Sequence, residues 1–512
     1  MKTWERIWDG DGHVPVSLPK GVSKRWSDNF RAANDNFRFR EPYLPSRLKR
    51  AILRTAFAFV KPVQPKGQTT VSVGVLTAQW KRLFEYLVDR RYVDHVTLSY
   101  PAVQEPPLYY FFGFHAFRDR DSDGNPPAVP GIARGFSLDY DTAVSTCIGE
   151  CLERVPFLYY HNTDSVVGSM QELKTKSLPL AEVDDINAFS DAQRTARTSL
   201  GRISDRVPFR WIWGKKMSSP PEEQEVLIPS QLVYWRYKRM KGEPLLRARG
   251  THGGAGYFTK EGALLRALYE CVQRDGFFWH WLTGSAPEQI DPASMRSGKT
   301  RDLIDVIQQF DFKIHLLNIT PLDIPIPSVF CVLTSRTSPH ASICCGSGSS
   351  ITLEEAIHSA LEEALSMHHW LSHYRTEYEL PENYEPLKTP LQDAERLSWW
   401  ASQLPEAIDF FLSGETKSYD TMLAVFSDLS ESAESEILAH VVRLIRESGK
   451  EIYYVESADQ ILADLGFHSV KVFVTKLLPM YHDTRNVPLA LLEKRFESSK
   501  GSMRNTLPHP FP

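Results

Sequence analysis

The chain has 512 residues and a formal net charge of −4, with 42% hydrophobic and 24% charged residues. This near-neutral balance gives no global attraction to nucleic acid or to an anionic membrane, no apolar run is long enough to span a bilayer, and the N-terminal residues lack the apolar stretch of a secretory signal. We therefore expect a cytoplasmic protein that has no nucleic-acid or membrane partner, with six cysteines that are free, buried thiols because none forms a CxxC pair.

The first elements along the chain are basic and amphipathic. Residues 16–60 are rich in Lys and Arg, and the pattern of 46–61 predicts a helix whose charged face is either solvated or docks a partner or peptide. A second amphipathic helix is expected at 78–93, and loops are expected at 117–131 and 214–225. The apolar runs 226–237, 328–335 and 470–478 read as strands. Strands alternate with helices, which indicates an α/β or α+β class.

Some motif-like strings do not qualify as sites. The "SGKT" at 297–300 resembles the end of a phosphate-binding loop, but Ala293 stands where that motif needs glycine. His358, His368 and His369 share a predicted helix without an acidic or Cys ligand at metal spacing, so we expect ordinary helix-surface histidines.

The informative signal is an internal repeat of three segments that start at Arg134, Gly254 and Gly346. Each has a glycine-bearing turn, a Ser or Thr able to cap a helix, and a helix with two small residues four apart and a glutamate three later. These positions are Ala143, Cys147 and Glu150; Ala263, Ala267 and Glu270; and Ala356, Ala360 and Glu363. The spacing puts all three on one helix face, where small residues allow close approach to a neighbouring element.

Inward carboxylates that converge need compensating positive charge. The first helix adds Glu153 and Arg154, and the second adds Gln273 and Arg274 at the same offsets. Hard divalent cations take oxygen ligands, and Mg²⁺ is usually shared with phosphate oxygens. Glutamates, arginines and glycine turns at helix starts therefore indicate a nucleoside triphosphate site. The alternative is three amphipathic helices with solvated glutamate faces.

Four blocks carry a resemblance to the YcaO family. Residues 130–160 resemble the first ExxER helix of that family, 228–278 the second helix with its run-in strand, 319–364 the third, and 447–483 the closing strand–helix–strand. The resemblance covers residue 105 to the end and implies an α+β fold in which three glutamate-bearing helices pack on mixed sheets around an ATP site. Residues 1–104 are then an N-terminal accessory or partner-docking region.

The terminal "PHPFP" resembles the PxPxP tail of the azoline-forming branch. That branch implies ATP-dependent cyclodehydration of Cys, Ser or Thr in a ribosomal precursor peptide, through phosphorylation of the backbone amide oxygen, with ATP and Mg²⁺ as cofactors. The alternating prolines stiffen the tail. We expect it to lie back across the core and end beside the ATP site, with the Pro512 carboxylate as a proton acceptor or a shaping element.

The resemblance assigns site residues position by position. The catalytic tail residues are Pro508, Pro510 and Pro512; the ATP-binding residues are Arg134, Thr146, Arg154, Arg274 and Glu363; the metal-binding residues are Glu150, Glu153, Glu270 and Gln273. The chain departs from the family pattern at Gln273, where glutamate is usual, and on the third helix at Ser359, where arginine is usual, and at Ser366 and Met367, where glutamine is usual.

The resemblance also implies partners. These are the precursor peptide, a separate ubiquitin-activating-like protein that binds the leader peptide, a flavin-dependent azoline dehydrogenase, and a second copy of the chain in a homodimer within a complex. Three other readings stay open: a YcaO enzyme that makes a thioamide or amidine, a non-catalytic docking scaffold with this fold, and an unrelated carboxylate-rich ligase or kinase.

Overall fold

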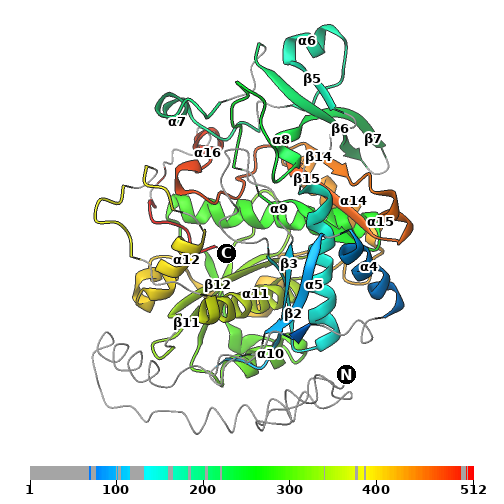
Figure 1. Ribbon diagram of the computed structural model, residues 1–512. Helices are drawn as coiled ribbons and strands as arrows, with labels where there is room; N and C mark the ends of the chain where they lie inside the picture. The colour runs from blue at the N-terminus through cyan, green and yellow to red at the C-terminus, as the bar shows by residue number, and fades with distance from the viewer. Residues whose placement is uncertain are drawn as a thin grey trace.

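The computed structural model describes residues 69–70, 77–90, 92–99, 101, 105–115, 132–158, 165–182, 186–201, 206–219, 222–248, 250–338, 341–374, 379–385, 388–391, 393–496, 503 and 505–511. Helices and three separate sheets alternate along these residues, which confirms the α+β class (Figure 1). None of the helices in this part of the chain is long and apolar enough to cross a membrane. The basic segment 16–60 and the predicted loop 117–131 lie outside the described residues.

The first sheet is antiparallel, with the order β1-β2-β3-β4. Its strands are β1 (Thr69–Thr70), β2 (Val93–Ser99), β3 (Tyr109–His115) and β4 (Ile132–Ser137). Helices α4 (Ala78–Asp89) and α5 (Tyr140–Arg154) bury their apolar faces with this sheet in one core cluster. The predicted boundary at residue 104 therefore falls within a sheet that both regions build.

The second sheet has the order β12-β11-β10-β9-β13 and carries the long helix α11 (Leu353–Tyr374) along β11 and β12. Its strands are β9 (Glu288–Ile290), β10 (Lys313–Asn318), β11 (Ser328–Thr334), β12 (Ile343–Ser349) and β13 (Thr416–Lys417). All seven residues of β11 are buried. Such a continuous apolar run is expected of a strand that is covered on both faces, and α10 (Lys299–Ile307) adds to the same core.

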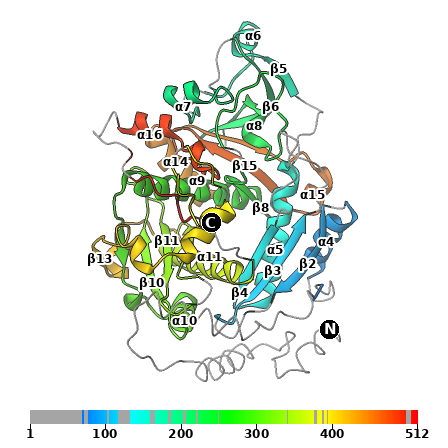
Figure 2. The same cartoon turned by 60° about the vertical axis from the view of Figure 1, so that its left-hand side comes forward.

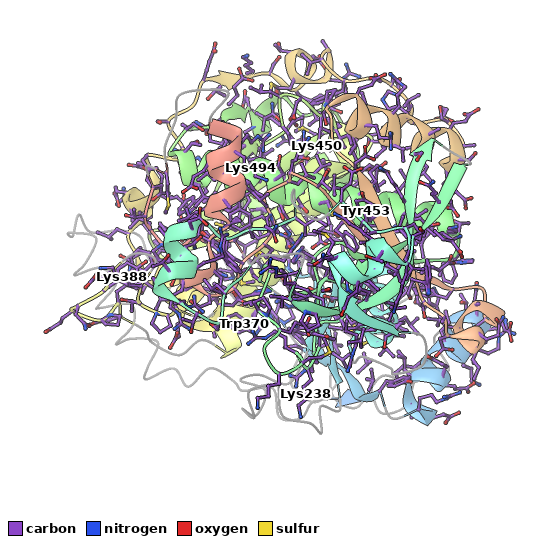
Figure 3. All side chains as sticks on the ribbon, turned by 90° about the horizontal axis from the view of Figure 1, so that it is seen from above. Lys238, Trp370, Lys388, Lys450, Tyr453 and Lys494 are labelled. Atoms are coloured by element: carbon purple, nitrogen blue, oxygen red, sulfur yellow. The ribbon has the colours of Figure 1, made fainter. Side chains whose placement is uncertain are left out.

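The third sheet has the order β5-β6-β14-β15-β8, with β7 paired to β6. Its strands are β5 (Ser165–Ser169), β6 (Pro208–Ser219), β7 (Glu222–Pro229), β8 (Gly254–Tyr257), β14 (Ile452–Glu456) and β15 (His468–Val474). Helices α9 (Lys260–Thr283) and α14 (Glu434–Glu447) share a core with it. Seen from above, Lys238 and Lys388 project from the rim, whereas Tyr453 of β14 is fully buried (Figure 3).

The remaining elements are short, apart from the ten-residue helix α12. They are η2 (Val155–Phe157), α6 (Met170–Thr175), α7 (Asp191–Ala196), α8 (Ser230–Val233), η3 (Pro292–Ser294), α12 (Asp393–Ser402), η4 (Pro405–Ile408), α13 (Tyr419–Leu423), α15 (Gln460–Asp464), η5 (Thr484–Asn486) and α16 (Leu489–Phe496). Figure 2 shows α9 and α11 in the middle of the molecule, with α5 beside the first sheet.

The structure corrects several local expectations. The sequence predicts a loop at 214–225, but most of this segment belongs to β6 and β7, which pair with each other. The strand expected at 226–237 ends at Pro229, where α8 begins. The helix expected at 78–93 ends at Asp89, and Val93 already belongs to β2.

The histidine and cysteine expectations divide. His368 and His369 are buried rather than on the helix surface, and the two ring nitrogens of His369 lie 2.8 Å from Glu105 Oε2 and 2.8 Å from Ser99 Oγ. The periodicity of α11 could not reveal this, because the partners of His369 lie at the end of β2 and in the connection between β2 and β3. All six cysteines are free as expected, and each is buried except Cys271, which is partly exposed.

Candidate active site

Three strand–helix units, β4–α5, β8–α9 and β12–α11, contain the repeated segments. Each helix contacts the strand that precedes it in its own unit. Each helix also contacts the strand of another unit: α5 contacts β8, α9 contacts β12, and α11 contacts β4. The three units therefore close into a ring, which brings together side chains that are far apart in the sequence.

One glutamate on each helix makes the same backbone contact. Glu150 accepts the N–H of Arg134, which lies 16 residues earlier. Glu270 accepts the N–H of Gly253, 17 residues earlier, at 2.7 Å, and Glu363 accepts the N–H of Ser347, 16 residues earlier, at 2.6 Å. A hydrogen bond from a backbone N–H holds the side chain of each glutamate in one orientation. The three repeated units therefore present their carboxylates at equivalent positions of the ring.

Glycines in the strands allow the small residues of the helices to approach. A Cβ on Gly135 would lie 1.9 Å from the carbonyl oxygen of Ala143, and one on Gly346 would lie 2.5 Å from that of Ala360. Real Cβ atoms do not approach so closely. The predicted close packing of the small helix faces is therefore confirmed for α5 and α11.

Two of the three glutamates are paired with an arginine one turn later. Glu150 forms an ion pair with Arg154, and Glu270 Oε1 lies 2.9 Å from Arg274 Nη2. The third helix has Met367 at the equivalent position, and Glu363 accepts instead the hydroxyl of Ser347 at 2.7 Å. Two of the repeated glutamates therefore have an arginine partner, whereas the third has a neutral hydroxyl donor.

Glu153 faces the same carboxylates. Burial raises the pKa of Glu153 well above its usual value despite the opposing charge of Arg154, and the negative charges of Glu150 and Glu270 raise the pKa further. A divalent cation bound beside these carboxylates would lower the pKa of Glu153, since it favours ionised carboxylates. Of the other assigned residues, Gln273 is buried, whereas Thr146 is exposed on α5.

The described residues contain no group of three or more His, Cys, Asp or Glu side chains that could hold a metal ion by themselves. Mg²⁺ commonly takes one or two protein carboxylates and completes its shell with water and phosphate oxygens. In addition, Arg274 has two buried donors, Nε and Nη1, without a hydrogen-bond partner among the described residues. Buried N–H donors that lack acceptors suit an anion such as a phosphate group. The arginine donors and the glutamate carboxylates together therefore fit a nucleotide bound with Mg²⁺.

A cluster of cations that the sequence did not single out lies against these carboxylates. Lys471 of β15 donates to the carbonyl oxygens of Gly250 at 2.9 Å and of His252 at 2.7 Å. Burial lowers the pKa of Lys471 to about 8, and the positive charge of Arg247 also lowers it. The sequence does contain one signal, a lysine inside the apolar run "VKVFV", where a charge is costly unless it is compensated.

The C-terminal tail lies against the core and reaches the second unit. The Phe511 ring lies 4.0 Å from the guanidinium of Arg274 and packs at 4.7 Å from the ring of Phe277 on the same helix. Pro508 and Pro510 are buried, and the C-terminal end of the chain lies beside α9 (Figure 2). Pro512 lies outside the described residues, so its assigned role stays a prediction.

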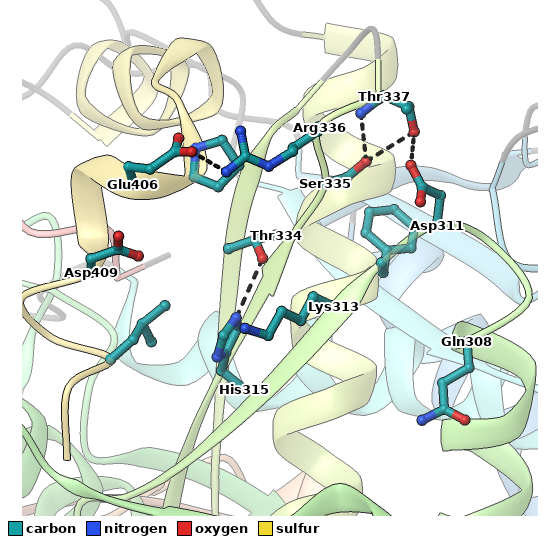
Figure 4. A pocket seen from close by; sticks show the side chains of 13 residues that line it. Gln308, Asp311, Lys313, His315, Thr334, Ser335, Arg336, Thr337, Glu406 and Asp409 are labelled. Carbon is teal, nitrogen blue, oxygen red and sulfur yellow. Dashed lines mark hydrogen bonds and ion pairs between the residues drawn. The ribbon is translucent and has the colours of Figure 1, made fainter. Parts of the chain in front are cut away.

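A separate pocket of about 610 Å³ lies at the ends of β10 and β11 near η4 (Figure 4). His315, Thr334 and Arg336 are among its lining residues. It contains none of the residues assigned from the sequence, and Arg336 is paired with Glu406.

Solved structures resemble this fold over most of the chain. A heterocyclase in complex with substrate and cofactor is 17% identical and has a TM-score of 0.64; the match covers 88% of this chain and 60% of that chain. A YcaO protein from Methanopyrus kandleri bound with AMPPCP and Mg²⁺ is 15% identical with a TM-score of 0.55, over 84% of this chain and 96% of that one. The E. coli microcin synthetase McbBCD complex with pro-MccB17 bound is 14% identical with a TM-score of 0.52, over 82% and 96% of the two chains.

Sequence identities this low show only that the fold is shared. The match covers only 60% of the heterocyclase chain. No curated protein matches the chain. A family model described as YcaO cyclodehydratase, ATP- and Mg²⁺-binding, matches residues 134–478, which include all three glutamate helices. That description agrees with the cofactors expected from the sequence, ATP and Mg²⁺. The chain belongs to the YcaO cyclodehydratase family.

Proposed function

We propose that this protein catalyses ATP-dependent cyclodehydration of Cys, Ser or Thr in a ribosomal precursor peptide and forms thiazolines or oxazolines. The contact between Phe511 of the PxPxP tail and Arg274 of the second glutamate helix carries the proposal. This contact brings the C-terminal tail, which resembles that of the azoline-forming branch, next to an arginine of the proposed nucleotide site. The solved heterocyclase, which was captured with substrate and cofactor, supports the same reaction class.

The ring of glutamates and arginines is the proposed nucleotide site. Glu150, Glu153, Glu270 and Gln273 would hold Mg²⁺; Arg134, Thr146, Arg154, Arg274 and Glu363 would bind ATP. When bound, ATP with Mg²⁺ supplies the phosphoryl group that turns a peptide amide oxygen into a leaving group.

The protein's own residues position and neutralise charge. Glu150 and Glu270 hold Arg154 and Arg274 in place before any phosphate arrives, so these guanidinium groups need little reorganisation to face developing negative charge. Lys471 fixes the turn that presents Gly253 to Glu270 by holding two of its carbonyl oxygens.

The tail is proposed to act on the peptide. A carboxylate at Pro512 would accept the proton of the attacking thiol or hydroxyl, or shape the site around it. Pro508 and Pro510 would keep this segment extended, because their rings restrict the backbone and so reduce the entropy lost on ordering.

The proposed partners are a precursor peptide and a separate ubiquitin-activating-like protein that binds its leader. The McbBCD assembly with pro-MccB17 bound is a precedent for a complex of this kind. A flavin-dependent dehydrogenase that oxidises azolines, and a homodimer within the complex, also belong to the proposal. We place the reaction in the cytoplasm, where ATP is available, and assign residues 1–104 a role in partner docking.

Mass spectrometry tests the reaction. The protein is incubated with the leader-binding partner, precursor peptide, ATP and Mg²⁺, and we expect a loss of one water mass for each ring formed. Glu150→Ala should abolish both this loss and precursor-dependent ATP hydrolysis, whereas Asp141→Ala, on the exposed start of the same helix, should leave both near wild type. Turnover by Glu150→Ala near the wild-type rate would refute the assignment of Glu150.

The non-catalytic scaffold is the second candidate. Gln273, which stands where the family pattern has glutamate, and the departures at Ser359, Ser366 and Met367 on the third helix favour it. A scaffold predicts no dehydration even with an active partner, and a thioamide- or amidine-forming enzyme predicts a different mass change from loss of water.

A further inference from the structure

The C-terminal tail is held through its backbone carbonyls. Trp281 Nε1 donates to the carbonyl oxygen of Leu507 at 3.2 Å, and Trp400 Nε1 donates to that of Pro508 at 2.6 Å. Arg396 Nη1 donates to the carbonyl oxygens of His509 and of Phe511, the latter at 2.6 Å. We call Trp281, Trp400 and Arg396 the carbonyl clamp.

The composition of the tail explains this mode of binding. Pro508 and Pro510 have no backbone N–H, so the tail cannot add to a sheet as an ordinary strand. Its carbonyl oxygens still need partners once they are buried. Indole and guanidinium groups are hydrogen-bond donors only. The clamp therefore satisfies the carbonyl acceptors of the tail and needs no backbone N–H donor from it.

Arg396 makes the largest number of these contacts and is itself fully buried. Its Nη1 also lies 3.0 Å from Nδ1 of His509, while Nε2 of that ring lies 3.0 Å from the carbonyl oxygen of Tyr481. A neutral His509 that donates from Nε2 satisfies the contact to Tyr481, and its Nδ1 then shares the two hydrogens of Arg396 Nη1 with the carbonyl oxygens of His509 and Phe511. Burial lowers the pKa of His509 well below its usual value, and the charge of Arg396 lowers it further, which favours this neutral form.

The clamp also reaches toward the nucleotide site. Arg396 Nη2 lies 2.6 Å from Asp393 Oδ1, and the other oxygen of that carboxylate lies 2.7 Å from His482 Nδ1. At the other end, Phe511 packs on Arg274 of the second unit.

We propose that Arg396 is a positioning residue, which sets the register of residues 507–511 on the ring by binding the carbonyl oxygens of His509 and Phe511. Its hydrogen bonds to described residues go to the tail and to Asp393, so it is proposed to act through the tail. The catalytic consequence rests on the proposed cyclodehydration, but the docking of the tail does not. Arg396 recognises the register of the tail through its backbone carbonyl oxygens. Pro508 and Pro510 have no backbone N–H, so they cannot offer these oxygens a competing donor.

Hydrogen exchange tests the clamp in the ligand-free protein. In Arg396→Lys the ammonium group cannot reproduce the fork of a guanidinium, and loss of a charge-assisted bond should raise the amide exchange rate of the 505–511 segment by about 10-fold or more. Exchange in α14 should not change. The matched control is Arg301→Lys on α10, whose guanidinium pairs with Asp305 away from the tail.

Kinetics separates positioning from packing. With partner, precursor peptide, ATP and Mg²⁺, Arg396→Lys should lower kcat about 10-fold or more while the KM for ATP stays within about 2-fold of wild type. A tail that stays as protected as in wild type overturns the proposal, and so does a released tail with unchanged kcat. If wild-type protein makes no azoline from any precursor, the proposed function fails, while the exchange measurement still tests the clamp.

A second variant covers the case in which Arg396→Lys does not fold. Trp400→Phe removes the donor to the carbonyl oxygen of Pro508 and keeps most of the aromatic packing against Trp281. We expect faster exchange in the 505–511 segment, and unchanged exchange there overturns the clamp.

Discussion

Gly135 offers a sharp test of the close packing that positions Glu150. A Cβ at this position would lie 1.9 Å from the carbonyl oxygen of Ala143 and 2.4 Å from the backbone nitrogen of Cys147. Both atoms belong to the backbone of α5, so no side-chain rotation relieves the clash. The substitution Gly135→Ala must therefore move the strand and the helix apart.

The size of that movement follows from the contact distances. Ordinary contact begins at 3.4 Å, so the 1.9 Å approach requires a separation of about 1.5 Å. Overpacking of this kind costs about 1–3 kcal/mol of folding free energy. The bond between Glu150 and the N–H of the adjacent Arg134 spans the same interface, and a displacement of about 1 Å in a catalytic constellation can cost about 100-fold in rate.

Gly149→Ala is the matched control, because it adds the same methyl group within the same strand–helix unit, on α5 instead of β4. Its Cβ would meet only a ring carbon of Trp80, at an ordinary 3.6 Å, and replacement of glycine within a helix should stabilise it by up to about 1 kcal/mol. Urea denaturation gives the free energy of unfolding, and precursor-dependent ATP hydrolysis gives the rate. The reasoning is wrong if Gly135→Ala keeps wild-type stability and activity, or if both variants lose activity equally.

Three further predictions concern other parts of the chain. Lys471→Met leaves two carbonyl oxygens without their buried donor and should cost about 2–3 kcal/mol of unfolding free energy by urea denaturation, whereas Lys476→Met, whose contact to a carbonyl oxygen is exposed, should cost little. Burial lowers the pKa of His315 to about 4, so below pH 6.5 the unfolded chain takes up a proton at this residue that the folded chain does not; His315 should contribute about 1–2 kcal/mol of the stability lost between pH 7 and 5, and a slope in His315→Gln equal to that of wild type would contradict this. Extension of the chain by one or two residues beyond Pro512 should sharply cut cyclisation seen by mass spectrometry while the thermal midpoint stays unchanged; full activity would mean that the tail only packs.

The repeat could be predicted from the sequence because it is local. Two small residues and a glutamate at fixed helical offsets define one face, and the structure gives Glu150, Glu270 and Glu363 the same bond to a backbone N–H 16 or 17 residues earlier. The role of the strand glycines was less visible, since a glycine signals close approach only when the facing element is known.

The rest of the site depends on contacts between distant segments. His369 appeared to be a surface residue on α11, but its partners Glu105 and Ser99 are more than 260 residues away in the sequence. The contact of Lys471 with the turn at Gly250 likewise joins residues 221 apart. No local period records such pairings. The expected loop at 214–225 failed for a related reason, because its polar residues pair across a hairpin that only the register of β6 and β7 reveals.

The ring is symmetric in backbone but not in charge, and the asymmetry has a consequence. Glu150 and Glu270 each hold an arginine, whereas Glu363 holds the hydroxyl of Ser347. An aromatic ring gains most from packing on a desolvated cation, and only α5 and α9 offer a guanidinium one turn after the repeated glutamate. Phe511 packs on Arg274, so the tail distinguishes the second unit from the other two. Because Met367 stands where the other two helices have arginine, the third unit offers no guanidinium on which the tail could dock in the same way.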